Sequence, residues 1–204
     1  MTKTTYTSAA MHDGLLEGFL SKQRGNMADR LIPELRRRGR LLDIGCGEHP
    51  RFLMATRFAE KYGVDRLVDG RGGAPQSQAI TRMECDIETS DRLPFDDGFF
   101  DVVTMLAVFE HVEPERLVQL VAEIRRILKP GGVYILTTPA VWTDGLLRVF
   151  AKLRLVNPVL FDEHKDAYSH AKIPRILQRG GFEASKLRFG YFELFMNVWA
   201  TAAK

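Results

Sequence analysis

Short apolar runs alternate with longer mixed segments through the middle of the chain, residues 40–139. These runs predict five strands, at 41–44, 61–65, 79–84, 99–105 and 133–136. A helix is expected between the fourth and fifth strands, because Pro114 is well suited to a first helical turn and the apolar pattern continues to Leu128. Strands that alternate with helices pair in parallel through right-handed crossovers, so the pattern predicts an α/β fold with a doubly wound parallel sheet.

Two segments before residue 80 extend this pattern. Residues 14–38 carry apolar side chains at helical spacing, which predicts an N-terminal helix that ends in a basic run. Residues 66–78 contain three glycines and a proline, so the second crossover is expected to be a loop more than a full helix.

The C-terminal part predicts one helix and two strands. Residues 169–179 have a helical pattern that ends at a pair of glycines, Gly180 and Gly181. Residues 182–188 and 192–200 follow as two apolar runs placed around Gly190. This spacing predicts a pair of strands that turn at that glycine.

Composition narrows the function classes. The chain has 204 residues and 45% hydrophobic residues, which fits one folded domain. Its net charge of +3 is mild, and the basic run 36–38 with Arg40 has no aromatic-studded basic face around it, so no nucleic-acid partner is expected.

The chain lacks an apolar run of roughly 18 residues, the length that spans a bilayer. Residues 1–12 lack a signal-peptide core, so a cytoplasmic location is expected. Cys46 and Cys85 have neither disulfide nor metal-site spacing, and no metal is expected.

The most informative stretch is residues 41–50, where an apolar run reaches Asp43 and then Gly45 and Gly47. A strand that enters a turn without side chains lets a ligand approach the backbone closely. Pro50 stands where a dinucleotide fingerprint would carry its third glycine. Asp43 would repel a pyrophosphate but suits a cationic ammonium, so an NAD-dependent oxidoreductase is disfavoured.

The segment 43–47 resembles the first motif of the class I S-adenosylmethionine (SAM)-dependent methyltransferases, and further motifs follow in the family's order. Residues 61–65 end in an acid about 20 residues after the first glycine, where such folds place a ribose-binding carboxylate. Residues 85–87 resemble the family's adenine-binding corner. Residues 93–105 and 128–136 resemble its fourth and fifth strands with their turns. As a set they are similar to the methyltransferases of ubiquinone and menaquinone biosynthesis.

The resemblance implies a seven-stranded, mostly parallel Rossmann-like sheet with an antiparallel last strand. It also divides the single domain 1–204 into an N-terminal helical arm or lid (1–39), a SAM-binding core (40–139), an acceptor-side insertion (140–168) and a C-terminal helix with a β-hairpin (169–204). The implied cofactor is SAM, with S-adenosylhomocysteine as its product. The implied cofactor-binding residues are Asp43, Gly45, Cys46, Gly47, His49, Asp65, Arg66, Asp86, Ile87 and Leu106.

Two histidines are candidates for a general base. His111 follows the fourth strand, at the edge where the acceptor must lie, and His164 lies in the insertion. An alcohol or phenol acceptor needs a base, whereas other nucleophiles react by proximity alone. For each histidine, the alternative is a structural role as a helix cap or a loop hydrogen-bond partner. Glu110 is a candidate for binding the methionyl end or a cationic acceptor.

The acceptor is the least determined part of the prediction. Residues 141–161 combine many apolar side chains with three cations, which fits a helix packed on the sheet, a lid over an apolar acceptor, or a helix on a membrane surface. The Asn/Asp-Pro-Pro-aromatic signature of base and glutamine methylation is missing after the fourth strand. A small, largely hydrophobic acceptor is therefore predicted. A macromolecular methyltransferase and a non-catalytic SAM-binding protein remain alternatives.

Overall fold

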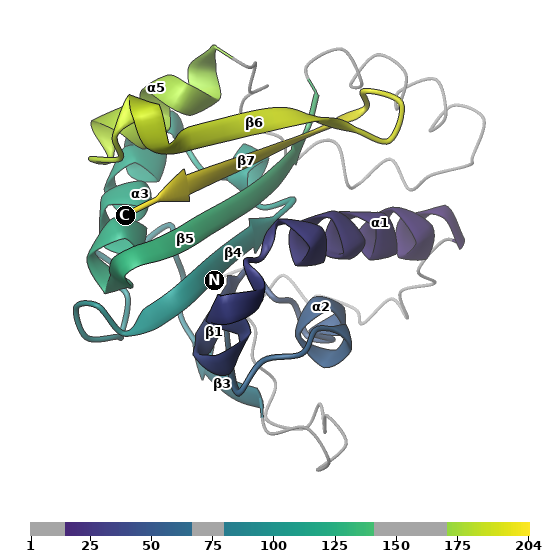
Figure 1. The fold of residues 1–204 in the computed structure, drawn as a ribbon, viewed down its shortest axis with the longest axis horizontal. Helices are drawn as coiled ribbons and strands as arrows, with labels where there is room; N and C mark the ends of the chain where they lie inside the picture. The colour runs from purple at the N-terminus through teal and green to yellow at the C-terminus, as the bar shows by residue number, and fades with distance from the viewer. Residues whose placement is uncertain (1–14, 67–79, 141–170) are drawn as a thin grey trace, which may run out of the picture.

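The computed structural model describes residues 15–66, 80–140 and 171–204, and these residues form a seven-stranded sheet (Figure 1). The strand order is β3-β2-β1-β4-β5-β7-β6. The strands are β1 (Arg40–Ile44), β2 (Glu60–Asp65), β3 (Ile80–Glu84), β4 (Phe100–Leu106), β5 (Leu128–Pro139), β6 (Leu187–Phe192) and β7 (Asn197–Ala203). Strands β1 to β5 pair in parallel, and β7 runs antiparallel to both of its neighbours. The predicted fold class is confirmed.

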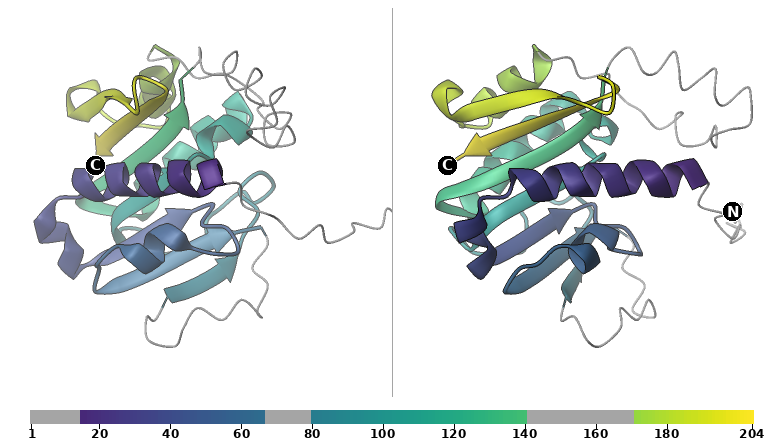
Figure 2. Two further views of the ribbon diagram at one scale, coloured as in Figure 1. Left: turned by 90° about the vertical axis from the view of Figure 1, so that its right-hand side faces the viewer. Right: turned by 45° about the vertical axis from the view of Figure 1, so that its right-hand side comes forward.

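Helices cover both faces of this sheet (Figures 1 and 2). They are α1 (Leu15–Leu31), α2 (Arg51–Ala55), α3 (Pro114–Ile127) and α5 (Lys172–Arg179), with short 3-10 helices η1 (Glu34–Arg38), η2 (Phe109–His111) and η4 (Ala184–Lys186). Leu41 and Val102 belong to the apolar cluster under α1 and α2. The next residues along the same strands, Leu42 and Val103, belong to the cluster under α3 and α5. This alternation follows from the two-residue period of a strand.

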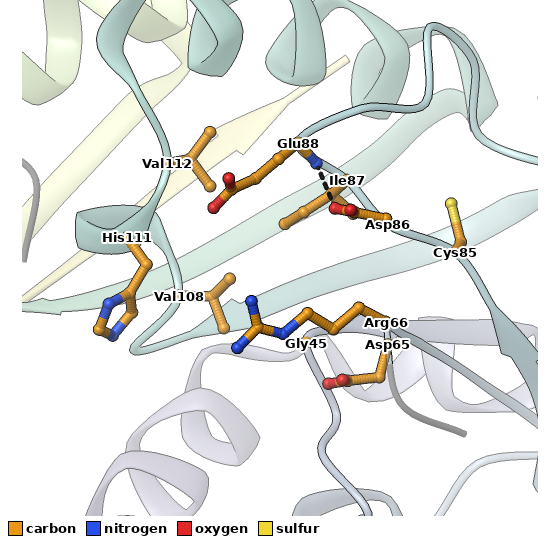
Figure 3. Close-up of a pocket in the computed structure, with 10 residues that line it drawn as sticks. All are labelled: Gly45, Asp65, Arg66, Cys85, Asp86, Ile87, Glu88, Val108, His111 and Val112. Atoms are coloured by element: carbon orange, nitrogen blue, oxygen red, sulfur yellow. Dashed lines mark hydrogen bonds between the residues drawn. The ribbon is translucent and has the colours of Figure 1, made fainter. Parts of the chain in front are cut away.

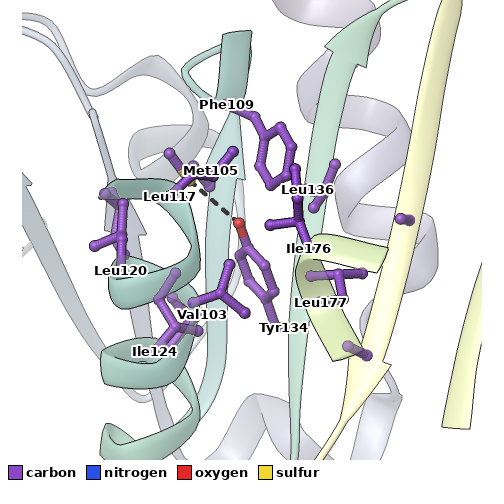
Figure 4. Close-up of a cluster of buried hydrophobic side chains, with 14 of the residues drawn as sticks. Val103, Met105, Phe109, Leu117, Leu120, Ile124, Tyr134, Leu136, Ile176 and Leu177 are labelled. Atoms are coloured by element: carbon purple, nitrogen blue, oxygen red, sulfur yellow. Dashed lines mark hydrogen bonds between the residues drawn. The ribbon is translucent and has the colours of Figure 1, made fainter. Parts of the chain in front are cut away.

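The larger core lies between the sheet and the pair α3 and α5 (Figure 4). Tyr134 stands at its centre, fully buried, and its hydroxyl donates a hydrogen bond to the sulfur of Met105 at 3.2 Å. Burial raises the pKa of Tyr134, so the phenol stays protonated. Leu117 and Ile176 close the cluster from the two helices, and each fully buried side chain of this size contributes about 1.5–3 kcal/mol.

The predicted N-terminal helix 14–38 is interrupted. Helix α1 ends at Leu31, and after Pro33 the chain continues as the 3-10 helix η1. Proline disfavours the helical conformation for the residue before it and provides no N–H for the ladder, which explains the break. Arg36 of the basic run donates to the carbonyl of Gly131 at 2.6 Å, so this part of the run holds the amino-end edge of the sheet together.

The C-terminal hairpin differs from the prediction in its boundaries. Gly190 lies inside β6 instead of at the turn, paired with Trp199 of β7. A Cβ at Gly190 would lie 2.9 Å from three atoms of the indole, so the glycine makes room for the ring. The turn lies at 193–196, where three successive residues have positive φ angles of 50°, 53° and 67°. None of the three is the glycine or asparagine that marks such turns in a sequence.

Asp43, expected beside the cofactor, lies within the sheet. Strand pairing places it opposite Thr104 of β4, whose hydroxyl donates a 2.6 Å hydrogen bond to its carboxylate. Only 4% of Asp43 is exposed. Burial raises the pKa of Asp43 to about 7, the Thr104 hydrogen bond opposes this, and the negative charge of Asp65 adds to it. The fold therefore contains a carboxyl group that changes its charge near neutral pH.

Gly190→Ala should destabilise the protein, because the new methyl group must displace the Trp199 ring. We expect a loss of about 1–3 kcal/mol in the free energy of unfolding, measured by urea titration with circular dichroism. Gly25→Ala is the matched control, since an added Cβ there meets its nearest atom at an ordinary 3.5 Å and lies inside a helix. Equal stability of the Gly190 variant and the wild type would contradict this account of the hairpin.

Asp43→Asn should change how stability depends on pH. Between the unfolded pKa of 3.8 and the folded value of about 7, the folded protein holds a proton that the unfolded chain has lost. Wild-type stability should therefore fall relative to the variant as pH rises through this window, and the loss should be complete above the folded pKa. We expect a difference of about 2–3 kcal/mol between pH 5 and pH 8 in urea unfolding. Parallel stability curves for the two proteins would exclude a raised pKa at Asp43.

Candidate functional site

The turn after β1 requires glycine at two positions. Gly45 and Gly47 have φ angles of 73° and 70°, in the left-handed region that side chains disfavour. A Cβ on Gly45 would lie 2.4 Å from a methyl group of Val108, in the segment that leaves β4. A Cβ on Gly47 would meet no atom within 4 Å. The turn thus packs tightly on one side and presents bare backbone to open space on the other.

Two side chains from neighbouring strands hold this turn in place. The carboxylate of Asp65, at the end of β2, accepts a 2.8 Å hydrogen bond from the Gly47 N–H. Arg82 of β3 donates to the Gly47 carbonyl at 2.9 Å. The thiol of Cys46 is turned away under the turn, toward Gly63. Burial, together with the charges of Asp43 and Asp65, raises the pKa of Cys46 to about 12, so this thiol is not a nucleophile.

A cavity of about 510 Å³ opens at the carboxyl ends of β1, β2, β3 and β4 (Figure 3). Its volume lies within the range of small-molecule sites. It is lined by Gly45, Asp65, Arg66, Cys85, Asp86, Ile87, Glu88, Val108, His111 and Val112. Open parallel sheets bind their ligands at this edge.

The lining is acidic at its strand ends. Asp65, Asp86 and Glu88 contribute three carboxylates, and Arg66 contributes a cation. Asp86 accepts a 2.9 Å hydrogen bond from the Glu88 N–H, which shapes the loop after β3 (Figure 3). Arg116 of α3 anchors the same loop, because its guanidinium donates to the carbonyls of Ile87, at 2.8 Å, and of Ser90. Arg116, which is outside the cavity lining, therefore holds the loop that carries the Asp86 and Glu88 carboxylates.

The segment after β4 provides the opposite wall. Val108 and Val112 flank the 3-10 helix η2, which ends at His111, and all three line the cavity. Glu110 is turned into the protein, where it is buried and accepts a 3.0 Å hydrogen bond from the Thr138 hydroxyl. The two candidate residues of this segment thus lie apart. His111 lines the cavity, whereas the Glu110 carboxylate is buried below it.

Of the predicted site residues, the structure brings six to the cavity: Gly45, Asp65, Arg66, Asp86, Ile87 and His111. Gly47 joins them through its hydrogen bond to Asp65. Asp43 and Cys46 lie buried beneath the turn, and His49 is exposed away from the cavity lining. Leu106 packs against the apolar cluster under α1 and α2. His164 and the segment 141–161 lie outside the described residues.

Sequence reasoning missed four lining residues, Cys85, Glu88, Val108 and Val112. Each of the four lies within one to three residues of a predicted site residue. Their closeness in the sequence to Asp86 and His111 was the signal that could have identified them. The expected cover of the mouth by the N-terminal helix stays a prediction. Helix α1 packs on β4 and β5, and none of its residues 18–31 is in the cavity lining.

The described residues contain no group of three or more His, Cys, Asp or Glu residues placed to hold a metal ion. Among the described helices, none has both the length and the apolar character needed to cross a bilayer.

Comparison with known proteins gives consistent matches. A family model described as "Methyltransferase domain" matches residues 19–187. The uncharacterized methyltransferase YcgJ of Bacillus subtilis is 29% identical over 121 residues, which are 57% of this chain and 47% of that protein. A probable SAM-dependent methyltransferase of Mycolicibacterium smegmatis is 29% identical over 144 residues, 70% of this chain and 51% of that protein. The chain thus spans about half the length of these curated relatives.

Solved structures share the fold at low sequence identity. A SAM-dependent methyltransferase from Archaeoglobus fulgidus aligns with a TM-score of 0.67 and 17% identity, covering 90% of this chain and 94% of that one. A putative methyltransferase from Haloferax volcanii, solved with the Trm112 methyltransferase activator, aligns with a TM-score of 0.68 and 15% identity, with 92% of each chain covered. From its family match and its fold, the chain belongs to the methyltransferase-domain family of class I SAM-dependent methyltransferases.

Proposed function

We propose that this chain binds SAM in the cavity at the carboxyl edge and transfers its methyl group to a small, largely hydrophobic acceptor. The observation that supports this most is the combination of bare glycine backbone with three carboxylates around one cavity. A cationic ligand is attracted to such a lining. The pyrophosphate of a dinucleotide would be repelled by it.

The lining residues fit the parts of SAM. Asp65 lies at the end of β2, where a carboxylate accepts hydrogen bonds from ribose hydroxyls. Asp86 is placed to accept from the adenine amine, with Ile87 and Val108 as apolar surfaces for the ring. The open face of Gly47 leaves room for the methionyl part. When bound, SAM supplies an electrophilic methyl group on a cationic sulfur.

The protein contributes position and exclusion of water more than acid–base chemistry. Methyl transfer is an in-line displacement, so holding the acceptor atom about 3 Å from the methyl group provides most of the acceleration. His111 is the described side chain best placed to take a proton from an alcohol or phenol acceptor, because it lines the cavity beyond β4. This role would contribute roughly 10²–10⁴-fold.

Apolar side chains at the same edge support a hydrophobic acceptor. Phe19, near the start of α1, is exposed, as are Leu194 and Phe195 at the tip of the β6–β7 hairpin. The start of α1 and this tip both lie at the side of the sheet where β4 and β5 end (Figures 1 and 2). Exposed apolar groups that gather at one edge typically mark a binding surface.

The full chain, incubated with methyl-labelled SAM and cell extract, tests this function. Label should appear in the small-molecule fraction, and in its organic-soluble part. Label in protein or RNA would instead support a macromolecular acceptor. Binding of SAM without transfer to any fraction would support a non-catalytic SAM-binding protein.

Asp65→Ala should weaken SAM binding by about 1–3 kcal/mol, because the ribose loses its acceptor and the Gly47 N–H loses its partner. Calorimetric titration of both proteins with SAM measures the change. Asp91→Ala is the control, since Asp91 is an exposed carboxylate outside the cavity lining. Unchanged SAM affinity in the Asp65 variant would rule this residue out as the ribose ligand.

His111→Ala should lower turnover at least tenfold while the affinity for S-adenosylhomocysteine stays within about threefold, if the acceptor must lose a proton. Initial rates with the acceptor found in the extract experiment provide the first measurement, and calorimetry provides the second. Asp91→Ala is again the control, because Asp91 is exposed and outside the cavity lining. Full turnover in the His111 variant would show that His111 is not the base.

A further inference from the structure

A second cavity, of about 660 Å³, lies between α1 and α2. It is lined by Gly18, Ser21, Lys22, Gly25, Asn26, Asp29, Arg30, Arg51, Phe52, Ala55 and Thr56. It shares no lining residue with the cavity at the carboxyl edge. A role for it therefore does not depend on the proposed methyl transfer.

Small residues on one face of α1 keep this cleft open. Gly18, Ser21 and Gly25 recur at helical spacing on the side that faces α2. A Cβ on Gly18 would come within 3.5 Å of the Arg51 guanidinium, and one on Gly25 within 3.5 Å of the Phe52 ring. Larger side chains at these positions would occupy the space between the helices.

More cations than carboxylates line the cleft. The cations are Lys22, Arg30 and Arg51, of which Arg51 has an interaction partner of its own, and the carboxylate is Asp29. That carboxylate accepts hydrogen bonds from Arg37 at 3.0 Å and from the Thr56 hydroxyl at 2.6 Å. Burial would raise the pKa of Asp29, but the two hydrogen bonds together with the charges of Arg37 and Arg57 outweigh it and lower the pKa. Asp29 is therefore ionised and already paired with Arg37.

Two of the cleft's cations, Lys22 and Arg30 of α1, have no ion-pair partner within the described part of the chain. Both side chains are exposed. Helix α1 needs neither cation for its packing, because its buried residue Ala28 and its partly buried residue Leu31 lie on another face. The two charges are thus available to a ligand in the cleft.

We infer that this cleft binds a small phosphate-bearing molecule. The cations match phosphate oxygens, and Ser21 and Asn26 add neutral hydrogen-bond donors beside them. Phe52 and Ala55 form an apolar wall for the rest of the ligand. The volume is that of a small-molecule site, and the cations line a concavity instead of an extended stripe, which favours a small ligand over a nucleic-acid backbone.

Calorimetry with inorganic pyrophosphate at about 0.15 M salt tests the inference, because that ionic strength screens charges at the open surface. Wild-type protein should bind pyrophosphate, and the double variant Lys22→Ala/Arg30→Ala should bind it at least tenfold more weakly. Arg38→Ala/Arg175→Ala is the matched control, since it removes two exposed arginines outside the cleft. Binding of S-adenosylhomocysteine should be the same in all three proteins, which separates this site from the proposed cofactor site.

Three results would overturn the inference: no pyrophosphate binding by the wild type, an equal loss in the control variant, or tighter binding of citrate or of a single-stranded RNA 12-mer than of pyrophosphate. Circular dichroism checks that each variant is folded. If Lys22→Ala/Arg30→Ala is unfolded, Ser21→Glu replaces it, because a carboxylate placed in the cleft should abolish pyrophosphate binding. Retained binding in a folded Ser21→Glu variant would also contradict the inference.

Discussion

The close approach of three strand exits at the carboxyl edge of the sheet is the constraint on which the site depends. The turn after β1 passes so near the segment after β4 that Gly45 has no room for a side chain against Val108. The end of β2 fastens the same turn through the hydrogen bond between Asp65 and Gly47. The turn after β1 can lie this close to its neighbours because its backbone carries no side chains. Its position therefore fixes the floor and two walls of the cavity. The rest of the sheet and the helices packed on it hold these strand ends in their relative positions.

This arrangement brings negative charge together at the carboxyl edge of the sheet. Asp43 is buried beneath the turn, Asp65 stands beside it, and Asp86 and Glu88 approach from the next loop. The negative charge of Asp65 adds to burial in raising the pKa of Asp43. A cationic ligand relieves the repulsion, whereas a phosphate increases it. The same electrostatics favours an anionic ligand in the cleft between α1 and α2, where cations outnumber carboxylates. The domain thus offers two cavities of opposite charge.

Much of the fold and half of the site could be predicted from the sequence, because both depend on local signals. Apolar runs gave the five parallel strands, and the spacing of Gly45, Asp65 and Asp86 gave the cavity edge. Other features have physical causes that a sequence pattern does not contain. The burial of Asp43 depends on its pairing with Thr104, some 60 residues away in the chain. The role of Gly190 depends on Trp199 across the hairpin, and the true turn uses left-handed residues of ordinary type.

The central claim is that the cavity at the carboxyl edge accepts the adenosyl and cationic methionyl groups of SAM and rejects a dinucleotide. Calorimetric titration of the full chain with SAM and with NAD⁺, under one set of conditions, tests it most directly. We expect one saturable site for SAM, with NAD⁺ bound at least a hundredfold more weakly. Saturable binding of NAD⁺ without binding of SAM would contradict it.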